Sequence, residues 1–202
     1  MEKRSNNPTA MRAKILKFTG EELCRYGFHA WKLNTVVERA GITKGSLFHH
    51  FKSKEDLMMH WMEETLPPLL EEEWLNPLAS ADPISALQQI FRHRAKQLEQ
   101  APAHDHATHP LTILVASVQA DDIALLGMLR GLHRQWLDGI SNALREGQKN
   151  QSVHPAIIPE EEAGVIVAAS TGVELLVKTQ GTAMVAGFLR STVAYLETLR
   201  PA

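Results

Sequence analysis

Hydrophobic positions recur with helical spacing along the whole chain. Leu33, Val36, Val37 and Ala40, for example, fall at i, i+3, i+4 and i+7, the pattern of one buried helix face. We find no convincing alternation of apolar and polar residues of the kind that strands show. Glycines, prolines and capping residues divide the pattern into nine expected helices: 8–27, 32–40, 43–50, 53–67, 83–100, 111–120, 122–148, 159–180 and 182–199. The fourth of these is expected to kink or stop at Pro67-Pro68.

One stretch, VVERAGITKGSLFHHFKSKEDL at residues 36–57, contains an unusually short helix between capping residues. Gly41 ends the helix before it, Thr43 caps the short helix, and Ser53 followed by Asp56 resembles a capping box that opens the next. Two helices joined through a glycine turn, with the second one short, predict a helix-turn-helix. The second helix of that motif enters the major groove of DNA, and two turns are enough to reach the bases.

Inward and outward positions on the short helix differ in chemistry. Leu47 and Phe51 are expected to anchor it to the preceding helices, while Gly45 lets its backbone approach DNA closely. The outward positions carry short or polar groups able to contact phosphates and bases: Thr43, Lys44, Ser46, His49 and His50. Of the two adjacent histidines, we favour His49 as the base reader and expect His50 to pack against its own domain.

The same stretch resembles the DNA-binding segment of the TetR family of bacterial transcriptional regulators. Its Glu-Arg-Ala-Gly at 38–41, Thr-Lys-Gly at 43–45 and Phe-Lys-Ser-Lys at 51–54 match that pattern, and the resemblance covers about residues 10–57. It implies DNA contacts from nine residues: Lys32, Thr43, Lys44, Gly45, Ser46, Phe48, His49, Lys52 and Lys54. Relatives often have tyrosine where Phe48 stands and threonine where Trp31 and Lys32 stand, so Lys32 is expected to replace a phosphate contact.

Charge divides the chain at about the same place. Residues 1–60 carry 11 Lys and Arg against 6 Asp and Glu, and residues 61–202 carry 10 against 17. A positive end attracts polyanions such as DNA, although ordinary surface variation is the alternative. The fold expected is all-α, with an N-terminal three-helix head and a larger C-terminal helical body. We predict two domains, a helix-turn-helix DNA-binding domain at 1–53 and a ligand-sensing and dimerisation domain at 54–202.

The body offers candidates for a dimer interface and an effector pocket. The resemblance implies that the last two long helices form a four-helix interface between subunits, for which we expect Ala168, Ala169, Gly172, Leu176, Phe188 and Leu189. A buried hairpin in a monomer is the alternative. A pocket needs apolar walls with a few polar groups, and we expect Phe91, Met128, His133 and Trp136 to supply it, with simple core packing as the alternative.

An enzyme is the competing class of function. The segment HDHATHP places His104, Asp105, His106 and His109 within six residues, a spacing that could bind Zn²⁺ or Ni²⁺ in a metal-dependent hydrolase. We find no nucleophile elbow, phosphate loop or paired carboxylates, and the glutamate runs 71–73 and 160–162 are interpreted as solvated helix ends. We therefore expect no enzyme, no cofactor and no bound metal.

The prediction is a ligand-responsive transcriptional repressor that binds a palindromic operator in double-stranded DNA as a homodimer and is released by a small-molecule effector. A nonspecific architectural DNA-binding protein is a further alternative. The single cysteine, Cys24, cannot form an internal disulfide, which favours a cytoplasmic protein. The most apolar run, residues 163–177, is too short to span a membrane, so no membrane partner is expected.

Overall fold

A computed structural model describes residues 8–100 and 108–201, and the regular elements within them are all helical. Its elements are α1 (Pro8–Ala30), α2 (Leu33–Ala40), α3 (Lys44–His50), α4 (Lys54–Leu70), the π-helical turn η1 (Glu71–Leu75), α5 (Asn76–Leu78), α6 (Pro83–Gln100), α7 (Pro110–Ser117), α8 (Ile123–Lys149), α9 (Pro159–Gln180), the 3-10 turn η2 (Thr182–Met184) and α10 (Val185–Thr198). Helix α4, η1 and α5 follow one another without a break and form one continuous helix. The prediction of an all-α chain with about nine helices is therefore confirmed for the described residues.

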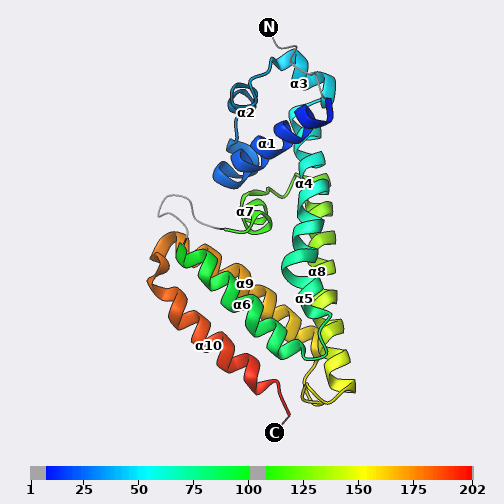
Figure 1. Ribbon diagram of the computed structural model, residues 1–202, viewed down its shortest axis with the longest axis vertical. Helices are drawn as coiled ribbons and strands as arrows, with labels where there is room; N and C mark the ends of the chain where they lie inside the picture. Colours follow the sequence, from blue (N-terminus) through cyan, green and yellow to red (C-terminus); the bar gives the residue numbers. More distant parts are fainter. Residues whose placement is uncertain (1–7, 101–107, 202) are drawn as a thin grey trace.

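The helices form an elongated molecule with a head at one end (Figure 1). Helices α1, α2 and α3 make the head, and α4 leads from it along the long axis beside α8. Helices α6, α9 and α10 fill the other end, and α7 lies between them and α1. None of the described helices has both the length and the apolar character needed to cross a membrane.

The local signals that define the head act as predicted. The Thr43 hydroxyl accepts a hydrogen bond from the Ser46 N–H at 3.1 Å, and the Ser53 hydroxyl accepts one from the Asp56 N–H at 3.0 Å. These bonds satisfy backbone donors that the first turn of a helix leaves without partners. Gly41 ends α2 with a left-handed φ of 67°. Gly27, with φ 75°, breaks the helical conformation near the end of α1.

The fourth helix does not stop at the proline pair. Pro67 and Pro68 lie inside α4, and the N–H of Glu71 bonds to the carbonyls of both. The helical path then continues through η1, although each proline removes one backbone donor. Its inward side chains explain why, since Leu66, Leu70 and Trp74 are all buried in the core and hold this segment against the body.

A close contact fixes the head to α4. Gly20 in α1 lies against the indole of Trp61, so close that a Cβ atom at position 20 would stand 2.3 Å from the indole nitrogen. Arg12 adds a two-pronged pair with the Glu64 carboxylate, with one N···O distance of 2.7 Å. Buried side chains continue from the head into the body as one hydrophobic core. The head and the start of α4 therefore move as one body.

Replacing Gly20 with alanine should destabilise the protein by about 1–3 kcal/mol, because the added methyl group overlaps the Trp61 ring. Gly127→Ala in α8 is the matched control, since nothing lies within 4 Å of its added methyl group. That variant should be as stable as the parent or up to about 1 kcal/mol more stable, because alanine favours helix. Urea denaturation at one protein concentration measures both, and equal stability of the two variants would contradict the close contact.

Candidate nucleic-acid interface and internal cavity

Of the predicted outward positions of the short helix α3, Thr43, Lys44 and His49 are exposed, while Ser46 and His50 are half-buried. Leu47 and Phe51 are fully buried beneath it, as expected. Lys44 and His49 are exposed, and Phe48 is 46% exposed despite its apolar ring. His50 is half-buried, with its ring centroid 6.3 Å from that of Phe51. The two histidines thus differ in exposure in the expected direction, and base reading by His49 stays a prediction.

Lys54 is held by Trp31, a contact that the sequence did not predict. Its ammonium donates a hydrogen bond to the carbonyl of Trp31 at 2.8 Å and lies 4.5 Å from the centroid of the Trp31 ring. Trp31 itself is buried, so it links the start of α2 to the start of α4. A cation over an indole face is attracted by the ring quadrupole. Lys54 is therefore positioned at the start of α4, while Lys32 and Lys52 stay exposed.

The body contains a cavity of about 360 Å³ among η1, α6, α8, α9 and the start of α7. One wall is apolar and aromatic, and its members are Leu69, Trp74, Pro77, Ile90 and Trp136. The other wall is polar, with Glu73, Gln89, His93, Arg94, His109 and Glu174 among its members. Apolar walls with a few polar groups are the usual composition of a small-molecule site.

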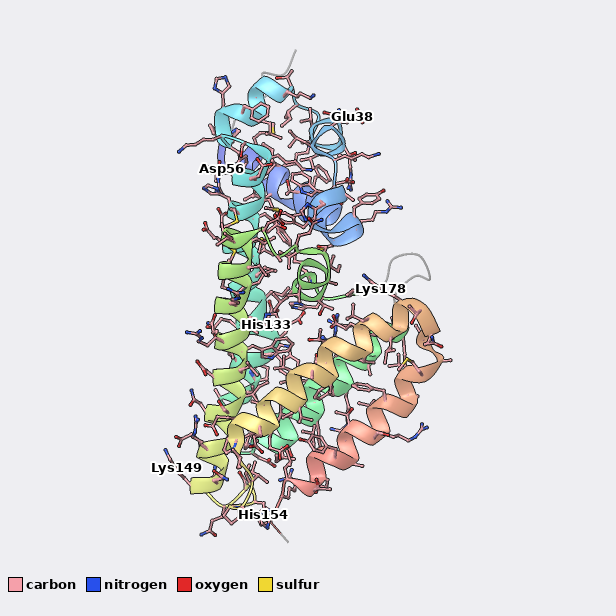
Figure 2. The ribbon with its side chains drawn as sticks, turned by 180° about the vertical axis from the view of Figure 1, so that it is seen from behind. Glu38, Asp56, His133, Lys149, His154 and Lys178 are labelled. Carbon is pink, nitrogen blue, oxygen red and sulfur yellow. The ribbon has the colours of Figure 1, made fainter. Side chains whose placement is uncertain are left out.

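The cavity differs from the predicted pocket in three of four residues. Trp136 lines it, with its ring centroid 4.7 Å from that of Trp74. Phe91 packs edge-on against Trp74 at 5.9 Å and lies outside the lining. Met128 and His133 also lie outside it, and the His133 ring contacts the Leu129 carbonyl of its own helix at 3.0 Å. His133 stands about midway along α8 (Figure 2).

A buried carboxylate organises the polar wall. Glu174 is 2% exposed and sits in the otherwise apolar run of α9. One of its oxygens accepts from Arg94 of α6 at 2.7 and 2.6 Å, and the other accepts from the backbone N–H of His109 at 3.0 Å. A buried charge is tolerated when it is paired and hydrogen-bonded in this way. The sequence signal was a single glutamate within fifteen mostly apolar residues.

His109 is a neutral, buried residue at the start of α7. Its Nδ1 accepts a hydrogen bond from the Leu111 N–H at 3.1 Å, so the proton of the neutral ring is on Nε2. Burial, with a smaller contribution from Arg94, lowers the pKa of His109 to about 3. The Nε2 atom lies 3.5 Å from Oε2 of Glu73.

Glu73 departs from the expectation that the first glutamate run is solvated. Glu71 and Glu72 are exposed, but the Glu73 side chain is only 23% exposed and faces the cavity lining. Burial raises the pKa of Glu73, partly opposed by Arg94. The extra residue of the π-helical turn η1 contributes to this placement, because it changes which side chains of the helix face inward.

The histidine-rich segment is described only at one end. His104, Asp105 and His106 lie outside the described residues, and His109 serves as the cap of α7. Within residues 8–100 and 108–201, no three histidine, cysteine or acidic side chains come together as metal ligands would. Metal binding by this segment stays untested.

Helix α7 contacts the head as well as the cavity. The Ser117 hydroxyl at its C-terminal end accepts a hydrogen bond from the Phe28 N–H of α1 at 2.9 Å. Gly27 beside it approaches Ser117 so closely that a Cβ atom would stand 2.9 Å from the serine Cβ. The imidazole of His29 lies 3.1 Å from the Asp122 carboxylate just before α8. His109 and Ser117 thus place one helix between the cavity and the head.

Comparison with known proteins agrees with this arrangement. Residues 15–59, which contain most of the head and the start of α4, match the bacterial regulatory proteins of the tetR family. The head and the start of α4 are thus similar to this family of regulators. The fold agrees over the whole length, since the reduced form of Escherichia coli NemR superposes with a TM-score of 0.81 at 22% identity, covering 96% of this chain and 99% of that one.

Two proteins that are similar to this chain in sequence have names that state a role. The A-factor receptor protein of Streptomyces griseus is 29% identical over 153 residues, which are 75% of this chain and 49% of the receptor. The transcriptional regulator RutR of Escherichia coli K12 is 30% identical over 94 residues, which are 45% of this chain and 42% of RutR. The matches thus span about half the length of these relatives.

One face of α9 is apolar and exposed. Val165 is 50% and Leu176 is 48% exposed, and Ala168 is exposed between them. Gly172 lies on the same side, with open space where a side chain would be. Ala169 is half-buried. Phe188 and Leu189 in α10 are also half-buried and pack against buried residues of α6 and α9.

His109 should make stability fall in mildly acidic solution. The unfolded chain binds a proton below pH 6.5, whereas the folded chain resists it down to about pH 3, so stability is lost as pH falls through this window. In His109→Asn the side chain can still cap α7 but does not titrate. From pH 7 to pH 5 the parent should lose about 1–2 kcal/mol more than this variant, at about 1.4 kcal/mol per pH unit. Parallel urea-denaturation profiles would contradict the buried neutral ring.

Proposed function

We propose that this protein is a ligand-responsive transcriptional regulator, most simply a repressor, that binds a palindromic operator as a homodimer. The observation that carries the proposal is the exposed face of α3, a capped seven-residue helix anchored by buried Leu47 and Phe51. Such a helix can enter the major groove with its N-terminal residues against base edges. We propose phosphate and base contacts from Lys32, Thr43, Lys44, Gly45, Ser46, Phe48, His49, Lys52 and Lys54. The operator DNA lies in the cytoplasm, and we place the protein there.

The exposed face of α9 supports the homodimer. Val165, Ala168 and Leu176 are apolar and open to solvent in the single chain, and small residues allow another helix to approach. We propose that this face, with Phe188 and Leu189 at its border, meets the same face of a second copy. Two heads related by a twofold axis would then bind half-sites about one DNA turn, roughly 34–36 Å, apart. The proposed domain division is residues 1–53 and 54–202.

The cavity supports release by a small molecule. We propose that the effector binds there and acts on the head through α7. His109, the cap just before α7, lines the cavity, and Ser117, the last residue of α7, accepts a hydrogen bond from the backbone of α1. An effector shifts the equilibrium only if it binds the two head arrangements with different affinities. A tenfold loss of operator affinity needs about 1.4 kcal/mol of such coupling.

Selection of random double-stranded DNA on the purified protein near physiological salt tests the proposal directly. We expect a palindromic consensus with half-sites about one turn apart. Binding without any consensus would favour a nonspecific architectural protein, and no binding at all would contradict the DNA-binding head. The selected DNA then serves as the probe for variants.

Lys44→Ala should weaken binding to the selected DNA about 10- to 100-fold, because it removes one charged contact at the start of α3. If that contact is with a phosphate, the slope of log affinity against log salt should decrease by about 1. Lys149→Ala is the control, since Lys149 is an exposed lysine at the far end of the molecule (Figure 2). Fluorescence anisotropy titrations measure both, and equal losses would contradict the assigned interface.

Leu176→Glu should separate the proposed dimer, because symmetry would bury two unpaired carboxylates in one interface. We expect the dissociation constant of the dimer to rise roughly 100-fold, with each chain still folded since Leu176 is exposed in it. Ile123→Glu is the matched control, because Ile123 is 79% exposed at the start of α8 and away from the proposed face. Sedimentation velocity over a range of concentrations compares them, and an unchanged dimer in Leu176→Glu would exclude this face.

A further inference from the structure

One negative charge in the cavity has no matching positive charge. The guanidinium of Arg94 is bonded to Glu174, so these two charges compensate each other inside the polar wall. The carboxylate of Glu73 has no such ion pair with Arg94. Its Oε2 atom lies 3.5 Å from Nε2 of the neutral His109 ring. The cavity therefore carries one net negative charge, with exposed Glu72 adding a second at its border.

The aromatic part of the cavity lining is suited to a cation with an apolar body. Trp74 and Trp136 lie edge to face, with their centroids 4.7 Å apart, and both line the cavity. An indole face attracts a cation through its quadrupole, and the attraction grows when the cation is removed from water. Leu69 and Ile90 extend the same wall with apolar surface.

Other ligand charges fit less well. An anion would enter beside Glu73 and Glu174 with a single, already bonded guanidinium, so its burial would be opposed by charge repulsion. A neutral ligand rich in acceptors would need accessible N–H groups. The two unpartnered donors near the cavity, Nε2 of His109 and Nε1 of Trp136, are both covered from solvent. Other polar side chains such as those of Gln89 and His93 also line the cavity, but the partly buried charge in the lining that is not bonded to Arg94 is the Glu73 carboxylate, an acceptor.

We propose that the cavity binds organic monocations with a flat or bulky apolar body, and that Glu73 is their counter-ion. This inference rests on the proposed function, in which the cavity holds the effector. It assigns that effector to a chemical class, a quaternary or protonated amine attached to an aromatic or alkyl group. Charge selects the ligand through Glu73, and the tryptophan wall provides the apolar contact area.

Two probes of equal shape and different charge test the ligand class. Phenyltrimethylammonium and its neutral isostere tert-butylbenzene differ in one central atom, and their binding to the full chain is followed by tryptophan fluorescence and by calorimetry. We expect the cation to bind at least tenfold more tightly than the isostere. In Glu73→Gln this preference should fall to less than threefold, because the variant keeps the shape and loses the charge. Glu71→Gln is the matched control, because it removes an exposed carboxylate of the same helical turn that lies outside the cavity lining, and it should keep the preference.

The outcomes separate the ligand class from the regulatory role. Equal or tighter binding of the isostere, or no binding of the cation, would overturn the inference, as would a preference that survives Glu73→Gln. Glu73→Asp keeps the charge and should keep the preference for the cation. If Glu73→Asp keeps it and Glu73→Gln loses it, the loss is due to the missing charge and not to a general defect of folding. Selection of operator DNA by the ligand-free protein is measured separately, so its failure would reject the regulator while the preference for cations could still stand.

Discussion

The buried carboxylate of Glu174 is the interaction on which the body depends. It is bonded to α6 through Arg94 and to the first turn of α7 through the His109 backbone, while α9 carries it. Removing either partner would leave a charge in the core, a change far more costly than the loss of a surface ion pair. The position of α7 follows from this bond, and so does the depth at which the His109 ring is buried. The cavity lies beside this charged group, where α6, α9 and the start of α7 meet.

The head, in contrast, is held together by close packing. Its helices are held to one another and to α4 by close apolar contacts, with Trp61 against Gly20 and Trp31 beneath Lys54. A pocket of about 100 Å³ lies between the end of α1 and the start of α4, much smaller than the cavity in the body. A change that begins in the body can therefore reorient the head as a unit, through α4 on one side and the end of α7 on the other. Two connections of this kind constrain rotation more strongly than one.

The head could be predicted from the sequence because its signals are local. Thr43, Ser53 and Gly41 each act within four residues, and the spacing of apolar residues fixes which face of α2 and α3 is buried. The cavity could not be predicted in this way. Its polar wall joins Arg94 to Glu174, 80 residues apart, and His109 to Glu174, 65 residues apart. No periodic pattern relates such positions, and only Trp136 of the four expected pocket residues lines the cavity.

The π-helical turn at 71–75 also has an evolutionary consequence. A π-helical turn accommodates one extra residue within an α-helical path. Deleting one residue there would restore regular α-helical geometry, while the helix on either side kept its register. The side chains of Glu73 and Trp74 would then take other orientations, and the lining of the cavity would change while α3 and the exposed face of α9 stayed as they are. Insertion or deletion of one residue in this turn can therefore alter the chemistry of the cavity without altering the buried faces that hold the head and the body together.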